Sequence, residues 1–532
     1  MSGQYQLPFL PPGWVSTTLG ELITILRGVS YPQNAALENP LEDYVPILRA
    51  NNIQESISLK NLVYVPSEYV RPEQFLQVGD IVVAASSGSR HLVGKAAQLQ
   101  NNWRGSFGAF CYALRPLENI NRKFVGFFLQ TPKYRKRISE LSSGININNL
   151  KQENILGIPC LLPPLAEQQR IVDEIEKQFS RLDVAVEMLQ RVERNLEMLR
   201  TATLKAAVEG RLVPTEAALA RTEGSDYEPA NMLLKRILRE RRARWEADQL
   251  AKLKEQGKKP KDNQWKDKYT EPSTPDMDNL PELPEGWIWA TVEQLASFEA
   301  NSITDGPFGS NLKTEHYTNE GPRVIRLQNI RDGIFNDVPA HISQEHFEKL
   351  SKHQVKANDI VIAALGEALP RACIVPTSVG DAIVKADCVR LEPNPNITSS
   401  KYLNISLNSK PTRNRTASIV HGVGRPRLNL GEIKSIALPL PPLPEQRRII
   451  AEVERRISVI EELKTLVTNA LRRATILRQK ILRDAFAGKL VRQDPADEPA
   501  RVLLERIRAE KAEREVEARQ EGENGQEKRR GR

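Results

Sequence analysis

Cysteine and long apolar runs are scarce in this chain of 532 residues. The four cysteines, Cys111, Cys160, Cys373 and Cys388, form no CxxC pair, which argues against a disulfide framework or a paired-cysteine zinc site and suits a reducing compartment. No apolar run approaches the length of a membrane span, and no signal peptide precedes Trp14. We therefore expect a cytoplasmic protein that does not associate with a membrane.

Catalytic signatures are also missing. Residues 88–96 (GSRHLVGKA) resemble a phosphate loop, but the spacing is one residue too long, and no Ser or Thr follows Lys95 to bind magnesium. The sequence contains no G-x-S-x-G, no H-E-x-x-H and no glycine-rich cofactor loop paired with the Asn-Pro-Pro-aromatic motif of an amino-methyltransferase. We predict no catalytic residue, no bound metal and no bound cofactor, while a nuclease built on dispersed carboxylates stays open. The net charge of +9 permits nucleic-acid binding but does not identify it.

The strongest positive signal is a long helix that occurs twice. Residues 162–168 (LPPLAEQ) open a run without Gly or Pro that ends at Gly210. Residues 440–446 (LPPLPEQ) open a second run that ends at Gly488, so the offset is 278 residues at both ends. Prolines before a helix and glycine after it are typical boundaries. Equal length and spacing predict a duplicated domain rather than a short solenoid repeat.

Apolar residues recur every seven positions in both runs, which is typical of a coiled-coil seam. The predicted seam consists of Ile175, Leu182, Leu189, Leu196, Val453, Ile460 and Val467. We expect nine further apolar residues to lie in the same stripe: Ile171, Phe179, Val186, Leu199, Ile449, Ile457, Leu463, Leu471 and Leu477. A run of about 44 residues is roughly 66 Å long. We expect the helices to pack on each other as an antiparallel pair, although sequence alone leaves a parallel pair open.

The segments before the two helices also repeat. Each begins with a Pro-x-Gly-Trp turn, at residues 11–14 and 284–287, and β-type runs and polar loops follow in the same order. The predicted fold class is therefore α/β, with two similar globular domains, a two-helix coiled coil and pseudo-twofold internal duplication. The expected segments are residues 1–161 (first domain), 162–212 (first helical region), 213–282 (charged helix and linker), 283–439 (second domain), 440–492 (second helical region) and 493–532 (charged helix and disordered tail).

This arrangement resembles the specificity subunit of type I restriction–modification enzymes over nearly the whole chain. The resemblance rests on the two LPPLxEQ openings with their uninterrupted helices, the Gly-Trp turns, and residues 305–313 (DGPFGSNLK). The first domain departs from that last pattern, because it has RGVSYP at residues 27–32. The resemblance implies two target-recognition domains that read two half-sites of a split, asymmetric DNA target, with the helices setting their spacing.

The resemblance also implies the partners. Two methyltransferase (modification) subunits would dock on the helices, restriction (translocase) subunits would join where the system has them, and S-adenosylmethionine would bind to the modification subunits. Double-stranded DNA would be the ligand of this chain. A related methyltransferase-only or phage-defence system, an enzyme whose motif escapes recognition, and a coiled-coil adaptor protein stay open as alternatives.

Arg, Asn, Gln and small polar residues in the loops are candidates for DNA contact, because these groups read base edges and bind phosphates. The first-domain candidates are Arg49, Asn51, Asn52, Ser87, Arg90, His91, Asn146 and Asn148. The second-domain candidates are Lys313, Arg326, Gln328, Arg371, His421, Arg425 and Arg427. Four arginines repeat between the domains and are predicted to contact phosphate: Arg135, Arg137, Arg413 and Arg415.

Overall fold

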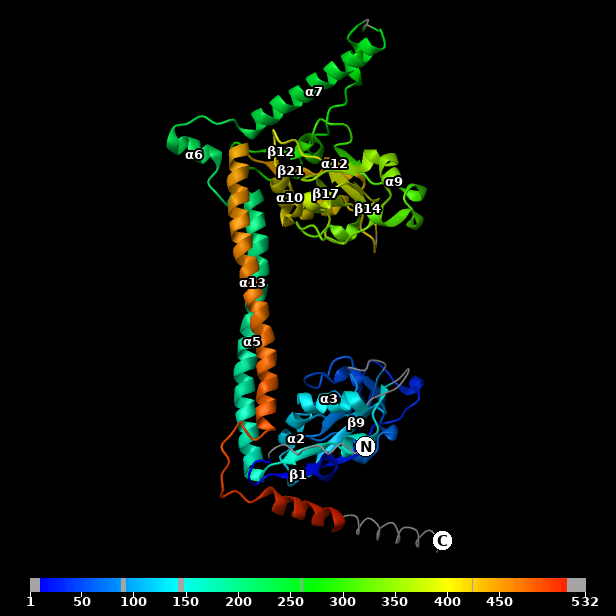
Figure 1. Ribbon diagram of the computed structural model, residues 1–532, viewed down its shortest axis with the longest axis vertical. Coiled ribbons are helices and arrows are strands. Elements are labelled where there is room, and N and C mark those ends of the chain that lie inside the picture. Colours follow the sequence, from blue (N-terminus) through cyan, green and yellow to red (C-terminus); the bar gives the residue numbers. More distant parts are fainter. Residues whose placement is uncertain are drawn as a thin grey trace. The chain divides into compact units, whose positions relative to one another are not determined.

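The computed structural model describes residues 10–87, 92–141, 148–258, 260, 262–422 and 424–513. The chain divides into two compact units (Figure 1). The first combines the chain up to Gln190 with the chain from Thr468 onward, and the second spans residues 191–467. Each unit therefore holds one sheet-containing domain and one part of each long helix. Within the described ranges, no helix is both long enough and apolar enough to cross a membrane.

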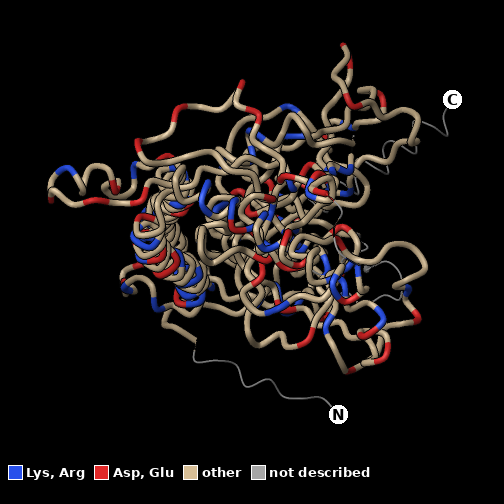
Figure 2. Tube along the Cα trace, turned by 90° about the horizontal axis from the view of Figure 1, so that it is seen from above, with Lys and Arg blue, Asp and Glu red and all other residues tan. Residues whose placement is uncertain are grey.

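The two long helices are α5 (Leu165–Val208) and α13 (Leu443–Ala485), which begin 278 residues apart as the sequence predicts. In the second unit Arg200 forms an ion pair with Glu461 at 2.7 Å, and Lys464 with Glu197 at 2.5 Å. In the first unit Arg478 pairs with Asp183 at 2.7 Å. Because later residues of α5 pair with earlier residues of α13 in both units, the helices are antiparallel. Figure 2 shows acidic and basic residues interspersed along them.

The predicted seam is confirmed for the residues spaced by heptads. Ile175, Leu196, Val453, Ile460 and Val467 are buried, while Leu182 and Leu189 are half-buried. The wider stripe was wrong at Leu199, Leu463 and Leu477, which are 49%, 41% and 46% exposed. Two helices bury only a narrow seam, so apolar residues beside it stay in solvent.

The first domain is built on two small sheets. A four-stranded antiparallel sheet has the order β2-β9-β5-β7, and a three-stranded sheet has the order β4-β3-β8. Its strands are β1 (Val15–Thr18), β2 (Ile23–Arg27), β3 (Tyr44–Leu48), β4 (Val63–Pro66), β5 (Ile81–Ala84), β6 (Ser86–Ser87), β7 (Ala96–Gln98), β8 (Ser106–Phe107), β9 (Cys111–Pro116), β10 (Asn148–Asn149) and β11 (Pro159–Leu162). Its helices are α1 (Leu19–Leu22), α2 (Arg122–Phe128), α3 (Pro132–Leu141) and α4 (Gln152–Leu156). Helix α3 begins at Pro132, which separates it from α2.

The second domain repeats this plan. Sheet β13-β20-β17-β18 corresponds to β2-β9-β5-β7, and sheet β15-β14-β19-β16 corresponds to β4-β3-β8 with one added strand. Its strands are β12 (Ile288–Thr291), β13 (Ile303–Asp305), β14 (Tyr317–Ile325), β15 (His341–Ile342), β16 (Gln354–Val355), β17 (Ile360–Ala363), β18 (Arg371–Ile374), β19 (Ala382–Val384), β20 (Cys388–Leu391) and β21 (Ala437–Leu440). Its helices are α8 (Val292–Leu295), α9 (Gln344–Lys349), α10 (Ser400–Asn408), α11 (Lys410–Thr416) and α12 (Leu430–Ser435).

The two repeated sequence motifs meet at the start of each long helix. The Trp14 indole N–H donates to Glu167 Oε2 at 2.9 Å, and the Trp287 indole N–H donates to Glu445 Oε1 at 3.0 Å. Burial raises the pKa of both carboxyl groups. The Gly-Trp turn and the LPPLxEQ opening are therefore two halves of one contact, which fastens each domain to the helix that follows it. The sequence shows both motifs but not that they bond to each other.

Each domain is completed by a helix from elsewhere in the chain. The first turns of α7 (Ala230–Glu255) contribute Ala230, Leu233, Leu234 and Ile237 to the core of the second domain. Helical residues 500–513 contribute Ala500, Leu503, Leu504 and Ile507 to the core of the first. Ala230 N–H donates to Gly286 O at 2.8 Å, and Ala500 N–H donates to Gly13 O at 2.9 Å. The two charged helices are thus equivalent parts of the repeat.

The segment predicted as a solvated linker after α7 is partly docked. The rings of Trp245 and Trp265 stack with centroids 6.1 Å apart, and Tyr269 lies 5.3 Å from Trp245. Ser273 donates to Glu293 through its backbone N–H and its hydroxyl, both at 3.0 Å. The polar composition conceals these few aromatic and hydroxyl anchors, and the assignment of residues 213–282 as charged helix and linker stays a prediction.

Candidate nucleic-acid interface

The loop after β3 in the first domain has the same construction as the loop after β14 in the second. Asn52 is buried, accepts from Arg49 N–H at 2.9 Å and donates to Ser58 O at 3.0 Å and Lys60 O at 2.9 Å. Asn329 is also buried and bonds to the backbone of Arg326, Asn336 and Val338, each at 2.9 Å. Asn52, a candidate for reading bases, is therefore used to shape the loop.

The arginine of this loop also donates a hydrogen bond to the loop backbone. Arg49 Nη2 donates to Asn61 O at 3.1 Å, and Arg326 Nη2 donates to Pro339 O at 3.2 Å. Between the arginine and the asparagine lie the exposed residues Asn51 and Gln328, at equivalent positions. Both side chains can pair with an adenine edge. The loop thus presents one amide side chain in each domain on a backbone that its neighbours hold in place.

Two other candidate loops meet each other in both domains. In the first, β6 pairs with β10 in antiparallel register, with Asn148 opposite Ser87. In the second, Leu365 is bridged to Arg427, and Gly366 N–H donates to Pro426 O at 3.0 Å. The sequence predicted these loops separately and gave no sign that they pair. Arg90, His91 and Asn146 lie outside the described residues, and only the backbones of Ser87 and Asn148 are described.

The 421–427 loop carries three second-domain candidates. Its ends pair through the backbones of His421 and Arg427. The His421 ring lies 2.6 Å from Glu432 Oε1, and Arg427 forms an ion pair with Asp387. Arg425 is exposed and makes no polar side-chain contact to any residue that the structure describes. Arg427 and Arg425 therefore present cationic groups in one exposed loop.

Two further candidates of the second domain belong to other segments of the chain. Lys313 is exposed and lies 3.5 Å from Glu315, a weak surface ion pair. Arg371, at the start of β18, is half-buried beside Gly366, and its Nε has no hydrogen-bond partner among the described atoms. Both stay predictions as DNA contacts.

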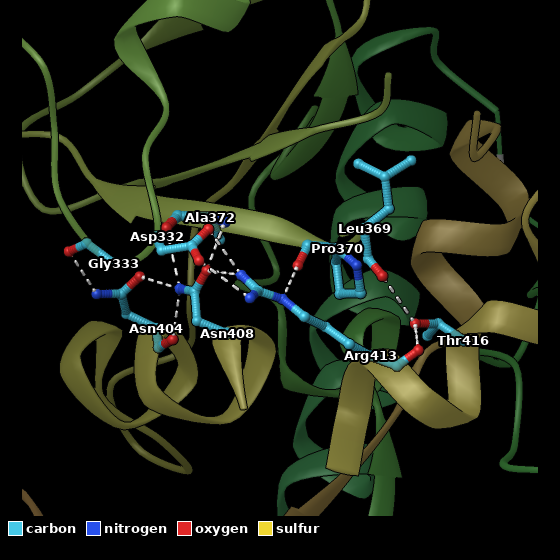
Figure 3. A network of polar contacts seen from close by, with 9 residues as sticks. All are labelled: Asp332, Gly333, Leu369, Pro370, Ala372, Asn404, Asn408, Arg413 and Thr416. Carbon is cyan, nitrogen blue, oxygen red and sulfur yellow. Dashed lines mark hydrogen bonds and ion pairs between the residues drawn. The ribbon is translucent and has the colours of Figure 1, made fainter. Parts of the chain in front are cut away.

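Three of the four repeated arginines serve their own domains. Arg413 pairs with Asp332 through both terminal nitrogens, at 3.1 and 2.9 Å, and its Nε donates to Pro370 O at 3.1 Å (Figure 3). Arg415 lies 4.7 Å from the Trp289 ring centre, and burial lowers its pKa. Arg135 donates to Val93 O at 3.2 Å. Arg137 is exposed and pairs with Glu140 at 3.3 Å. Packing accounts for the repetition, and phosphate contact stays a prediction.

The Arg413 network also joins separate elements of the second domain. Asn408, at the end of α10, donates to Ala372 O at 2.9 Å and accepts from Arg413 Nη2 at 3.1 Å. Asn404 donates to Gly333 O at 3.1 Å (Figure 3). These bonds hold the end of α10 against β18 and the 332–333 turn. They fix the sheet from which the candidate loops emerge.

The described residues contain no group of three or more His, Cys, Asp or Glu side chains that could hold a metal ion. All four cysteines are buried and unpaired, and burial raises the pKa of Cys111, Cys160 and Cys373 to about 12. These thiols are packing groups of the sheets rather than reactive nucleophiles.

Comparison with known proteins gives a consistent family. The family model for the type I restriction modification DNA specificity domain matches residues 11–194 and 309–469. The type I restriction enzyme EcoKI specificity subunit of Escherichia coli (strain K12) is 27% identical over 526 residues, covering 94% of this chain and 96% of the relative. The StySPI specificity subunit of Salmonella potsdam is 30% identical over 523 residues, with the same coverage.

A solved chain agrees in fold. It comes from work on complex assembly and conformational transition of the type I R–M system, and it superposes with a TM-score of 0.60 at 16% identity. The match covers 90% of this chain and 99% of that chain. The family assignment rests on the family model, which matches more than half of the chain, and on the StySPI relative. The chain belongs to the type I restriction–modification DNA specificity subunits.

Proposed function

We propose that the two sheet domains each read one half of a split, asymmetric target on double-stranded DNA. The observation that carries this proposal is the repeated scaffold with unlike loops. The Trp–Glu contact, the buried loop asparagine and the sheet order recur in both domains. The loop sequences beside them differ, as with RGVSYP at residues 27–32 and DGPFGS at residues 305–310. Two readers on one scaffold with different reading groups would recognise two different half-sites.

The long helices would dock two modification subunits, one in each unit. Apolar side chains are exposed beside the seam in both: Val184, Met188, Ile476 and Leu477 in the first, and Val192, Met198, Leu199, Val459, Leu463 and Leu466 in the second. Clusters of exposed apolar residues mark protein-binding surfaces. Arg170, near the start of α5, contributes less to this surface because it is paired with Asp497 at 2.5 Å. Because the surface occurs twice, two copies of one partner fit.

The chemistry would be supplied by those partners. The chain would contribute no catalytic group, and S-adenosylmethionine would bind to the modification subunits. Restriction subunits would complete the assembly where the system has them. The lengths of α5 and α13 would set the spacing between the half-sites.

Methylome sequencing of a host with and without this chain tests the proposal. We expect methylation at one split motif, with two unlike half-sites and a fixed spacer, to depend on the chain. Restoration of that motif by the modification subunits without the chain would contradict it. Native mass spectrometry of the purified assembly is expected to show two modification subunits for each copy of this chain, and saturation at one would contradict the docking proposal.

A further inference from the structure

One turn occupies the same place in both domains but carries different side chains. It spans residues 108–110 before β9 and residues 385–387 before β20. Cys111 N–H donates to Gly108 O at 2.8 Å, and Cys388 N–H donates to Lys385 O at 3.0 Å. The carbonyl of the last turn residue accepts from the end of the neighbouring strand, as Ala85 N–H to Phe110 O and as Ala364 N–H to Asp387 O, both at 2.8 Å. Phe110 and Asp387 are therefore equivalent positions.

A glycine braces this turn in each domain. A Cβ atom added at Gly28 would come within 2.0 Å of Gly108 O, and one added at Gly306 would come within 2.1 Å of the Lys385 carbonyl carbon. Both contacts leave no room for a side chain. Because Gly28 and Gly306 contact the same turn, residues 27–32 and 305–310 occupy equivalent places although their sequences differ. The turn is held by backbone contacts, so its side chains can vary without loss of its position.

In the first domain the turn carries an exposed aromatic side chain. Phe110 is 70% exposed. It borders a cavity of about 530 Å³ whose polar lining comprises Ser30, Tyr31, Gln33, Arg49, Asn51 and Ser86. A single exposed apolar residue needs no explanation. Here, however, the ring stands at the rim of a hollow whose lining includes two predicted base readers, Arg49 and Asn51.

In the second domain the same position carries an acid with a partner. Asp387 forms an ion pair with Arg427, whose side chain is 53% exposed. An arginine has five N–H donors, so an ion pair leaves donors free for a base edge. A carboxylate fixes the direction of the guanidinium plane and lowers the entropy lost when it binds.

We propose that this turn determines base preference in both domains. Phe110 makes apolar contact with a thymine methyl group or a base face beside the hydrogen-bonding groups of Arg49 and Asn51. Asp387 is a positioning residue that orients Arg427 toward the O6 and N7 acceptors of guanine. This inference rests on the proposed function, because it assigns the reading groups within the two readers.

In vitro selection from random DNA tests the first half of the proposal, using the full-length chain assembled with its modification subunits. For Phe110→Ala we expect the base preference to relax about tenfold at one or two positions of one half-site. The other half-site and the spacer are expected to stay unchanged. Phe110→Leu, which keeps an apolar group, is expected to retain part of the preference. The matched control is Leu41→Ala, which removes another exposed apolar side chain of the first domain, 57% exposed and outside the cavity lining.

The second half of the proposal uses Asp387→Asn and Arg427→Lys. Both substitutions are expected to relax the preference for guanine at one position of the half-site that the second domain reads. The effect of Arg427→Lys should be stronger, because lysine cannot form a bidentate pair of hydrogen bonds with guanine. Binding to unrelated DNA is expected to stay within about twofold for Asp387→Asn, since the substitution adds no contact to phosphate.

The outcomes separate this inference from the function beneath it. If the wild-type assembly selects a split motif and Phe110→Ala selects the same motif with equal affinity, the turn is not a reader. A uniform loss on specific and unrelated DNA would also overturn it, because that pattern indicates phosphate contact or misfolding. If the wild-type assembly selects no split motif at all, the proposed function itself fails.

Discussion

The side chains of the two recognition domains differ most at positions that contribute least to folding. Both keep a buried asparagine in the loop after β3 or β14, and both keep a tryptophan bonded to the glutamate that opens the following helix. Yet Phe110 stands where the other domain has Asp387, and Asn51 stands where the other has Gln328. The comparison separates two kinds of residue. A side chain that recurs with the same contacts builds the scaffold, and one that changes where the backbone hydrogen bonds recur is a candidate reader.

Exchange of a whole domain should produce the largest change in the DNA sequence that the protein recognises. We expect replacement of residues 283–439 by the matching segment of a relative to change one half-site completely and to leave the other intact. The physical reason is that the second domain has its own core, its own Trp–Glu contact and its own α7 turns. Methylome sequencing of hosts carrying each chimera measures the result. Simultaneous change of both half-sites would break the two-reader comparison.

Lengthening both helices should have the next largest effect. One heptad added to α5 and one to α13 preserves the seam and lengthens the pair by roughly 10.5 Å. That length corresponds to about three base pairs and to roughly 100° of DNA twist, which a heptad does not follow. We expect weaker binding, with any surviving preference shifted to a longer spacer and the half-sites unchanged. Selection on DNA with randomised spacers decides this, and recovery of the original spacer at full affinity would rule the helices out as the ruler.

Loss of the loop asparagine should be costly in either domain. Asn52→Ala and Asn329→Ala each remove three hydrogen bonds from a buried amide to the loop backbone, so we expect each to cost about 2–3 kcal/mol of local stability. Hydrogen exchange of the amides in the two domains measures the effect, and each variant should loosen only its own domain. Asn51→Ala is the matched control, because its exposed side chain should alter base preference with little change in stability. Equal protection in Asn52→Ala and wild type would show that the amide bonds are dispensable.

These contrasts explain what the sequence could and could not predict. Helix length, seam and duplication follow from periodicity and glycine positions, so α5 and α13 begin where expected. The interfaces between distant segments do not follow from periodicity. The hydrogen bond between Trp14 and Glu167, for example, joins two motifs that are 153 residues apart. Polar residue type predicts exposure poorly: Asn52 and Asn51 are neighbours, and only one is buried. Residue type alone does not point to Phe110, because the groups expected to contact DNA are polar. Its position opposite Asp387 in the repeat would have been the available signal.

The smallest predicted effect concerns the two glutamates that open the helices. Oε1 of Glu167 has no hydrogen-bond partner in the part of the chain that the structure describes, whereas Glu445 Oε2 accepts from Glu216 N–H at 2.9 Å. Burial raises the pKa of Glu167 above 4.5, so the folded chain keeps this proton at a pH where the unfolded chain has lost it. The contribution of Glu167 to the free energy of unfolding is therefore present at low pH and is lost as pH rises through that window.

Glu167→Gln removes the buried charge and keeps the oxygen that accepts from Trp14. We expect the variant to be about 1 kcal/mol more stable than wild type at pH 7 and to lose less stability between about pH 4 and pH 7. Glu445→Gln should gain less stability, because Glu445 Oε2 accepts a hydrogen bond from Glu216 N–H that an amide N–H₂ group cannot accept. Glu452→Gln is the control of opposite sign, since Arg455 and Arg456 lower the Glu452 pKa to about 2. Its wild-type contribution is lost only as pH falls. Thermal unfolding of the three variants across this range measures the effect, and identical pH profiles for wild type and Glu167→Gln would show that the carboxyl is solvated in the folded chain.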